Sequence, residues 1–267
     1  MSRSDVYIGH RAVPGSTDSW TILHVPHSSL TIPPDVRQRI LVGDDELAHE
    51  LALMTDAHTD VIAERAASAA EQRPWSFVNQ LSRLVVDPER FTDERETMRA
   101  VGMGPVYTHT SAGVRLRHDD AAAERDLLAD WFHPYAEAMA DLVDGRLAAT
   151  GRATIIDVHS YPSQRLPYEI GGEGRPAICL GTDEVHTPGW LLTAAREAFA
   201  ALGDVDSDTP FAGCYVPQKH AKDKRVSALM VEIRRDLYMV EPGGPPTEGL
   251  VAVSRCLATL IDAVARH

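Results

Sequence analysis

The sequence predicts an α/β fold in which helices cover both faces of a sheet. Short apolar runs alternate along the chain with stretches in which apolar residues recur every three or four positions. Such alternation is typical of α/β sheets, where a helix connects one strand to the next. The length of 267 residues, with 44% hydrophobic and 24% charged residues, fits a single domain spanning residues 1–267.

The individual elements follow from hydrophobic periodicity and from the positions of proline and glycine. In chain order we expect a loose lead-in at 1–20, a strand at 21–25, a helix from 44 to about 72, short strands at 74–78 and 84–86, a surface excursion at 92–118, a helix from about 119 to 149, strands at 153–158 and 177–180, a helix from 187 to about 202, a second excursion at 204–226, a strand at 228–231 and a final helix from about 247. Loops as long as the first excursion are usually functional, often as lids.

The composition indicates which partners the protein can have and in which cellular compartment it is found. The formal net charge is −13 at pH 7, and so acidic a chain repels nucleic acid phosphates. The three cysteines are scattered without a C-x-x-C pair, which argues against a cysteine-rich zinc site or a disulfide framework and fits a reducing compartment. The first residues lead into no signal-peptide segment, and no apolar run approaches membrane-spanning length. We therefore expect a cytoplasmic protein with neither nucleic acid nor membrane as a partner.

Three apolar runs end in residues that can bind a metal or move a proton. His27, His159 and Glu232 each follow such a run or extend it. Ligands of open α/β sheets bind beyond the carboxyl ends of the strands, so these side chains could converge on one point. A catalytic zinc needs a few protein ligands, an open position for water and a nearby base. The pattern therefore indicates a catalytic zinc site.

Each of these residues also has a structural interpretation. A lone histidine in a turn is more often a surface or packing residue than a ligand. Asp157 shares a strand face with His159, where it would either orient the imidazole ring or cap loop amides. Glu232 gives the sharpest signal, because glutamate is rarely buried unless it is paired, although Arg234 could supply that pairing.

Two further groups of charged residues leave alternatives open. Arg83 and Arg90 lie near Asp87 in sequence. They could form a structural ion pair with it, or they could provide a guanidinium fork for a substrate carboxylate. Asp56 and Asp60 would share one face of a continuous helix, opposite its apolar stripe, and periodicity alone predicts that this face is solvated. A break near residue 59 would instead start a new helix and direct Asp60 at the site.

Several well-known motifs do not occur. The sequence contains no G-x-S-x-G, G-x-x-x-x-G-K-[ST], H-E-x-x-H or G-x-G-x-x-G, which disfavours elbow-type serine hydrolases, nucleotide hydrolases, zincins and dinucleotide-dependent enzymes. Ser28 or Ser160 as a nucleophile has no supporting motif.

Taken together, five short stretches resemble the N-formylglutamate amidohydrolase family, zinc-dependent amide hydrolases related in fold to the zinc carboxypeptidases. They occur in the family's order and cover nearly the whole chain. The stretches are VPHSS at 25–29, DAHTD at 56–60, LSRLVVD at 81–87, DVHS at 157–160 and VEI at 231–233, continuing through Tyr238 and Met239.

The resemblance implies a three-layer α/β/α domain with a mostly parallel mixed sheet of the phosphorylase/hydrolase-like, zinc carboxypeptidase-like type. It further implies one zinc ion, bound by His27, His159 and Asp60, with Asp56 as the alternative third ligand. Glu232 would be the general base.

The remaining predicted site residues concern the substrate. We expect Arg83, Arg90, Ser82 and His220 to bind it, with Arg83 also supporting the oxyanion, and His220 is the next choice of base after Glu232.

The expected reaction is hydrolysis of the amide bond of a small anionic N-acyl amino acid, such as N-formylglutamate, by metal-activated water. A zinc carboxypeptidase or another N-acyl amino acid deacylase would use the same residues, and a non-catalytic binding module would need no base. One departure bears on the substrate: the family commonly has asparagine before the arginine of its Asp-x-Asn-Arg motif, where this chain has Glu89. An acid in place of an amide can change what is bound.

Overall fold

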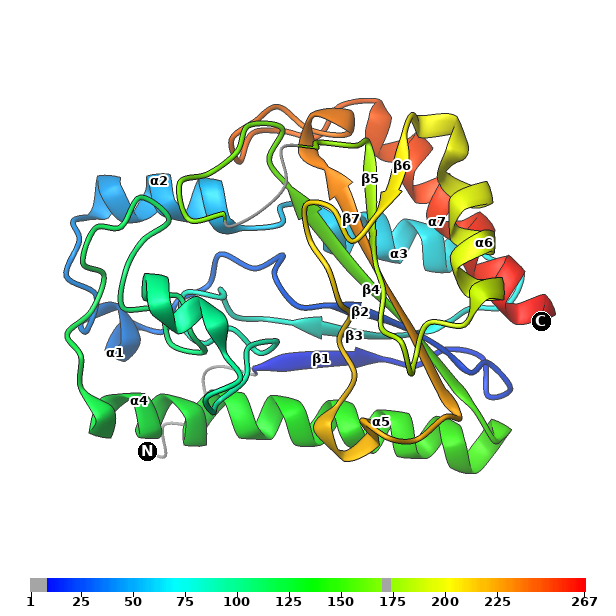
Figure 1. Cartoon of the computed structure of the whole chain (residues 1–267), viewed down its shortest axis with the longest axis horizontal. Helices are drawn as coiled ribbons and strands as arrows, with labels where there is room; N and C mark the ends of the chain where they lie inside the picture. Colours follow the sequence, from blue (N-terminus) through cyan, green and yellow to red (C-terminus); the bar gives the residue numbers. More distant parts are fainter. Residues whose placement is uncertain (1–8, 170–173) are drawn as a thin grey trace.

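Seven strands form one mixed sheet in this computed structural model, which describes residues 9–169 and 174–267. The strands are β1 (His10–Val13), β2 (Thr21–Val25), β3 (Trp75–Asn79), β4 (Ala153–Tyr161), β5 (Ile178–Gly181), β6 (Val205–Ser207) and β7 (Val226–Arg234). Their order across the sheet is β1-β3-β2-β4-β7-β5-β6 (Figure 1). The four central strands β3, β2, β4 and β7 are parallel, whereas β1 and β5 pair antiparallel with them. The predicted mostly parallel α/β sheet is confirmed.

Helices cover the sheet on both faces and complete the three layers. The helices are α1 (Pro34–Arg37), α2 (Asp44–Met54), α3 (Thr59–Ala69), α4 (Ala121–Leu127), α5 (His133–Thr150), α6 (Gly189–Phe199) and α7 (Gly249–Arg266). One face packs against α3, α6 and α7, and the other packs against the long helix α5 (Figure 1). A π-helical turn at Leu128–Phe132 joins α4 to α5, so the predicted long helix is nearly continuous.

The central strand β4 shows why the sheet needs both layers. Its nine residues are all buried, because successive side chains point to opposite faces and each face has a helical cover. Ile156 and Val158 join the core under α3, α6 and α7, whereas Ile155 packs with Met139 of α5. The odd-numbered positions, including Asp157 and His159, therefore point to the α5 side.

The structure differs from the sequence prediction in four places. The helix expected from 44 to 72 is interrupted at 55–58, between α2 and α3. Residues 84–86 form buried turns rather than a strand, because Asn79 and Ser82 accept backbone N–H groups and turn the chain. Strand β1 lies in the predicted lead-in, whose residues 1–8 are outside the described part of the chain, and β6 lies in the second excursion.

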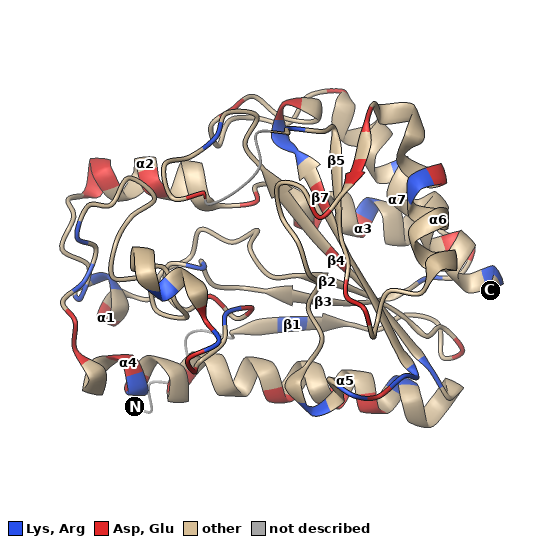
Figure 2. Cartoon of the chain, viewed as in Figure 1, with Lys and Arg blue, Asp and Glu red and all other residues tan. Residues whose placement is uncertain are grey.

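Charged residues lie mainly on the helices and loops, and few of them are on the strands of the sheet (Figure 2). Glu232 on β7 is one of the exceptions, and it is buried. Across the described ranges, no helix has both the length and the apolar character that crossing a membrane requires.

We expect Ile156→Ala to lower the free energy of unfolding by about 2–5 kcal/mol, the usual cost of removing a buried Ile side chain beyond Cβ. Ile156 is fully buried at the centre of the sheet. Urea denaturation measures the change. Val240→Ala is the matched control: Val240 is 54% exposed, so its loss should cost about 0.5 kcal/mol or less. Equal costs for the two variants would contradict this account of the core.

Candidate active site

A cavity of about 620 Å³ opens where β2, β4 and β7 end. His27, His159 and Glu232 all line it, so the expectation that these strand ends meet agrees with the geometry. Both predicted excursions contribute to its walls, through residues 95–98 and 210–215. A volume of this size is typical of sites for small organic ligands.

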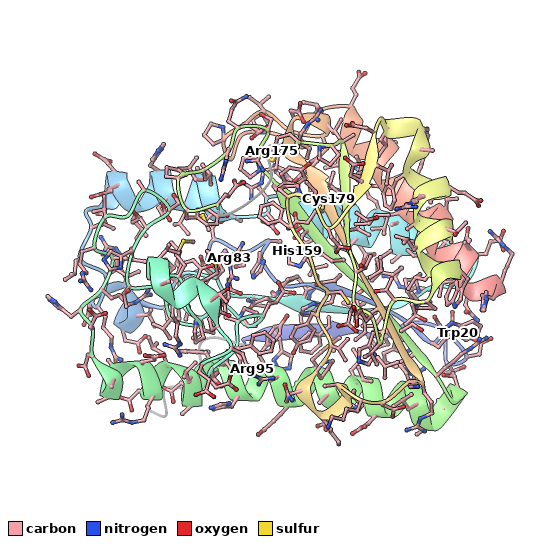
Figure 3. All side chains as sticks on the ribbon, viewed as in Figure 1. Trp20, Arg83, Arg95, His159, Arg175 and Cys179 are labelled. Atoms are coloured by element: carbon pink, nitrogen blue, oxygen red, sulfur yellow. The ribbon has the colours of Figure 1, made fainter. Side chains whose placement is uncertain are left out.

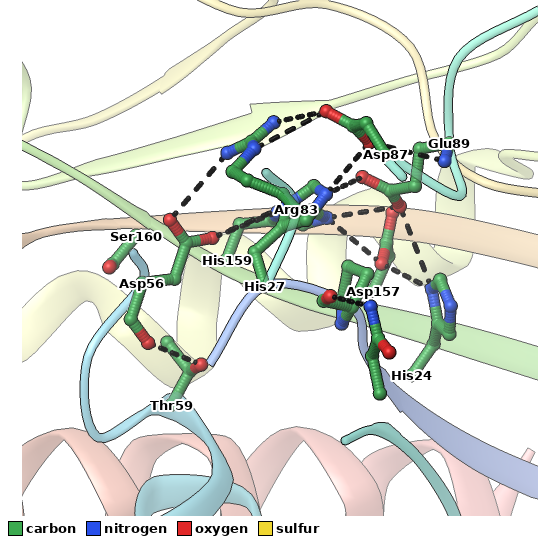
Figure 4. A network of polar contacts seen from close by, with 12 residues as sticks. His24, His27, Asp56, Thr59, Arg83, Asp87, Glu89, Asp157, His159 and Ser160 are labelled. Atoms are coloured by element: carbon green, nitrogen blue, oxygen red, sulfur yellow. Dashed lines mark hydrogen bonds and ion pairs between the residues drawn. The ribbon is translucent and has the colours of Figure 1, made fainter. Parts of the chain in front are cut away.

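Three possible metal-ligand atoms converge at the floor of this cleft (Figure 4). The Nδ1 atoms of His27 and His159 lie 3.3 Å apart. Asp56 Oδ2 lies 3.2 Å from Nδ1 of His159 and 3.8 Å from Nδ1 of His27. A tetrahedral zinc with bonds of about 2.1 Å separates its ligand atoms by about 3.4 Å. The three atoms are therefore spaced as one metal ion requires.

The opposite nitrogen of each imidazole faces a carboxylate. His27 Nε2 lies 2.9 Å from Asp87 Oδ1, and His159 Nε2 lies 3.0 Å from Asp157 Oδ1. A carboxylate at Nε2 holds the proton there, fixes the ring orientation and makes Nδ1 a better electron-pair donor. Both rings are thus prepared to coordinate a metal through Nδ1.

Glu89 provides a second arrangement of ligand atoms. Its carboxylate lies 3.2 Å from His159 Nε2 and 3.7 Å from His27 Nε2, and these three residues could also surround an ion. However, the Nε2 atoms already face Asp87 and Asp157, whereas both Nδ1 atoms face Asp56. The Nδ1 side is therefore the better candidate for a metal ion, with Glu89 in a supporting position.

Asp56 reaches the histidines because the helix breaks beneath it. Its backbone N–H donates to His27 O over 3.0 Å, and Thr59 Oγ1 donates to Asp56 O over 2.7 Å. His58 in the break adopts a left-handed conformation with φ of 68°, which is uncommon for a residue other than glycine. Arg235 Nη2 then donates to Asp56 Oδ1 over 2.9 Å. The break and the guanidinium together fix the carboxylate.

Electrostatics at this point favour positive charge. Burial alone would lower the pKa of His159, but the carboxylates of Asp157 and Glu89 outweigh it and hold that pKa well above its usual value. The pKa of His27 is raised in the same way, because Asp87 and Asp56 outweigh burial and the Arg83 charge. A negative potential that retains protons on imidazoles also favours a divalent cation, which would displace those protons.

Glu232 lies beside the histidines and forms no ion pair with an arginine or lysine in the described part of the chain. It pairs with His159 in the β4–β7 register, so the two side chains are neighbours on one face of the sheet. Its Oε2 has no hydrogen-bond partner among the described residues. Burial, with a further contribution from the Asp56 charge, raises the pKa of Glu232 to about 7, against the lowering effects of His159 and Arg235.

Two arginines give the cleft a positive side near the end of β3. Arg83 donates to Asp87 Oδ2 over 2.8 Å and to Tyr107 Oη over 3.1 Å. Arg90 is less engaged: its buried Nε lies 3.5 Å from Asp87 Oδ2 without a hydrogen bond to a described residue, and its Nη1 lies 3.9 Å from Glu96 Oε1. Because Arg90 lines the cleft, its Nη groups are the donors more available to an incoming anion.

Residues 19–239 match the N-formylglutamate amidohydrolase family, and this range contains every residue placed in the cleft above. The chain belongs to this family. Its structure is similar to that of N-formylglutamate amidohydrolase from Ralstonia eutropha, with a TM-score of 0.81, 19% identity and 97% of each chain covered. It also resembles a gene product of Agrobacterium tumefaciens, with a TM-score of 0.70, 18% identity and coverage of 97% of this chain and 95% of that one. At these identities the two structures show the shared fold; no curated protein matches the chain.

Family membership confirms the resemblance found in the sequence and makes the chain a hydrolase. The structure nevertheless separates three expected site residues from the cleft. Asp60 lies in the first turn of α3, Ser82 Oγ accepts from Leu84 N in a buried turn, and His220 Nε2 lies 2.8 Å from Asp144 of α5. None of the three lines the cleft. Arg235 lines the cleft, although no pattern in the sequence indicated that it would.

The raised pKa of Glu232 predicts an effect on stability that is independent of catalysis. In metal-free protein, the unfolded carboxyl ionises near its ordinary pKa of 4.5 and the folded one near 7. The folded state therefore binds more protons between these values, and its stability falls as pH rises through that window.

Glu232→Gln removes this titration. From pH 5 to pH 8 the free energy of unfolding should fall by about 3 kcal/mol more in the wild type than in the variant. Urea denaturation of both proteins at the two pH values, with chelator present, measures the difference. Identical pH dependence in the two proteins would show that Glu232 ionises normally.

Proposed function

We propose that this protein is a zinc-dependent hydrolase that cleaves the amide bond of an N-acyl amino acid such as N-formylglutamate. One observation carries the proposal: Nδ1 of His27, Nδ1 of His159 and Oδ2 of Asp56 converge within 3.8 Å of one another. Beside them, the Glu232 carboxyl has an oxygen without a described partner. Family membership supports the reaction class.

The donor set fits zinc. Two imidazoles and one carboxylate are typical of catalytic zinc sites, which keep a further position open. His27, His159 and Asp56 would hold the ion, so Asp56 takes the place that the resemblance gave to Asp60. When bound, zinc would lower the pKa of a water molecule and polarise the acyl oxygen of the substrate.

Glu232 supplies the proton transfer. Its carboxylate would accept a proton from the attacking water and deliver it to the amide nitrogen, so that the amine can leave as the C–N bond breaks. A general base works best when its pKa lies near the working pH, and the pKa of about 7 meets that condition in the metal-free protein.

The arginines would orient the substrate. Arg90 has available donors and would grip the carboxylate of the amino acid, for which a planar guanidinium is better suited than an ammonium. Arg83 Nη1 lies 4.0 Å from Asp56 Oδ1, so it is close enough to the ligand atoms to steady negative charge on the acyl oxygen. Ser82 and His220 receive no substrate role here.

The metal ligands are tested by removing either aspartate. Asp56→Ala should lose zinc, because only two imidazoles remain, whereas Asp60→Ala should retain about one zinc per chain. Elemental analysis after dialysis, together with circular dichroism to confirm folding, measures both. A zinc-free but folded Asp60→Ala protein, with zinc kept in Asp56→Ala, would reverse the assignment.

The base is tested by Glu232→Gln, which preserves the shape of the side chain. This variant should fold and retain zinc but lose on the order of a hundredfold or more in kcat, the usual contribution of general acid–base catalysis. Amine release from N-formylglutamate and from N-acetyl and dipeptide analogues provides the assay and separates a deacylase from a carboxypeptidase. Loss of zinc would make Glu232 a ligand, and near-normal turnover would place the base elsewhere.

A further inference from the structure

The strand order arranges the functional groups in a line across the sheet. Reading from β3 towards β5, the arginines Arg83 and Arg90 come first. His27 after β2, His159 on β4 and Glu232 on β7 follow in that order. The register continues this row, because Cys179 of β5 pairs with Glu232. Figure 3 shows Arg83, His159 and Cys179 in this order across the view.

The far end of the row is largely apolar, in contrast to the arginine end. Asp183 after β5 also lines the cleft, and its Oδ1 accepts the N–H groups of Val185 and His186. Next to Glu232, the segment 210–215 of the second excursion forms the cleft wall beside β5 and β7. Phe211, Cys214 and Met230 line this part of the cleft. Met230 shares its strand face with Glu232, two residues later, so the apolar surface adjoins the base.

The structure holds this wall closely against the sheet. Cys179 Sγ–H donates to Phe211 O over 3.2 Å, and the Phe211 ring meets that of Tyr161 edge-on at 5.6 Å. Gly181 allows the segment to approach, because a Cβ there would lie only 2.1 Å from Gly213 O. A wall fixed at both its backbone and its ring is pre-organised to receive a ligand group.

From this arrangement we infer that the surface of Phe211, Cys214 and Met230 is an acyl-binding subsite that takes an aliphatic or aryl acyl group larger than formyl. The inference rests on the proposed function. A substrate whose carboxylate contacts Arg90 and whose acyl carbon lies at the histidines must direct its acyl substituent towards β5. A formyl carbon carries only hydrogen and would leave this wall unfilled. The cleft volume of about 620 Å³ gives room for the larger group.

The reaction remains an ordinary hydrolysis. Water adds to the acyl carbon, the C–N bond breaks, the water's proton passes to the leaving amine, and the products are a carboxylic acid and an amino acid. No oxidant, reductant or further reactant is required. The gain from the subsite would come from burial of apolar surface as the acyl group leaves water.

The test compares N-formyl-, N-acetyl-, N-butanoyl- and N-phenylacetylglutamate as substrates of the zinc-loaded full chain. From acetyl to butanoyl, kcat/KM should rise on the order of tenfold or more for each added methylene, as in other hydrophobic pockets. The butanoyl-to-acetyl ratio of kcat/KM measures this rise. Phe211→Ala should lower this ratio at least tenfold, and Phe211→Leu, which keeps an apolar side chain, should retain most of it.

Phe91→Ala is the matched control. Phe91 is also an aromatic residue of the cleft, but it lies next to Arg90 at the opposite end. Its loss should leave the butanoyl-to-acetyl ratio unchanged. Turnover that falls with each added acyl carbon would overturn the subsite while leaving the proposed hydrolysis intact, and so would equal ratios in Phe211→Ala and wild type.

A binding experiment separates failure of the subsite from failure of the proposed function. Calorimetry with the same compounds and Glu232→Gln protein should show affinity rising with acyl length. This rise should be absent in the double variant that carries both Glu232→Gln and Phe211→Ala. Absence of turnover for every compound would reject the proposed function. A binding series that is flat in acyl length would reject the subsite, whatever the turnover.

Discussion

The site depends on the interactions of the Asp56 carboxylate with Arg235 and with the two histidines. One oxygen accepts from Arg235 Nη2 at 2.9 Å, and the other faces the Nδ1 atoms of His159 and His27. A buried charge is tolerated only when it is paired and hydrogen-bonded, so the guanidinium makes this position possible. Arg235 also donates to Ser160 O and to Leu53 O at the end of α2. One side chain therefore joins the end of β4, the helix break and the carboxylate that is proposed as a metal ligand.

This dependence explains which parts of the structure the sequence could predict. Strand ends such as His27 and Glu232 follow local apolar runs, and local periodicity is sufficient to locate them. The break at 55–58 has no glycine or proline to signal it. Contacts from far along the chain stabilise it instead: Tyr238 Oη donates to Ala57 O, and His58 Nε2 donates to Gly244 O. Periodicity therefore placed the acid on a solvated helix face, and the resemblance favoured Asp60 over Asp56.

The same limit applies to the supporting groups. Asp157 was recognisable beside His159, because residues two apart share a strand face. Asp87 is 60 residues from His27, yet their side chains meet at 2.9 Å, and sequence alone suggested only its pairing with arginine. The positions of single residues near strand ends were thus predictable, whereas contacts made by loops that fold back over the sheet were not.

The charges of the cleft are distributed so that Glu232, the proposed base, has no ion pair with a described residue. Arg235 is occupied by Asp56 and two backbone carbonyls, and Arg83 is occupied by Asp87 and the Tyr107 hydroxyl. Neither forms an ion pair with Glu232, although both are near enough to lower its pKa. Pairing with either guanidinium would stabilise the ionised carboxylate and weaken it as a base. Two neighbouring aspartates therefore do more than hold imidazoles: by engaging the arginines, they leave Glu232 buried, unpaired and close to neutrality in pKa.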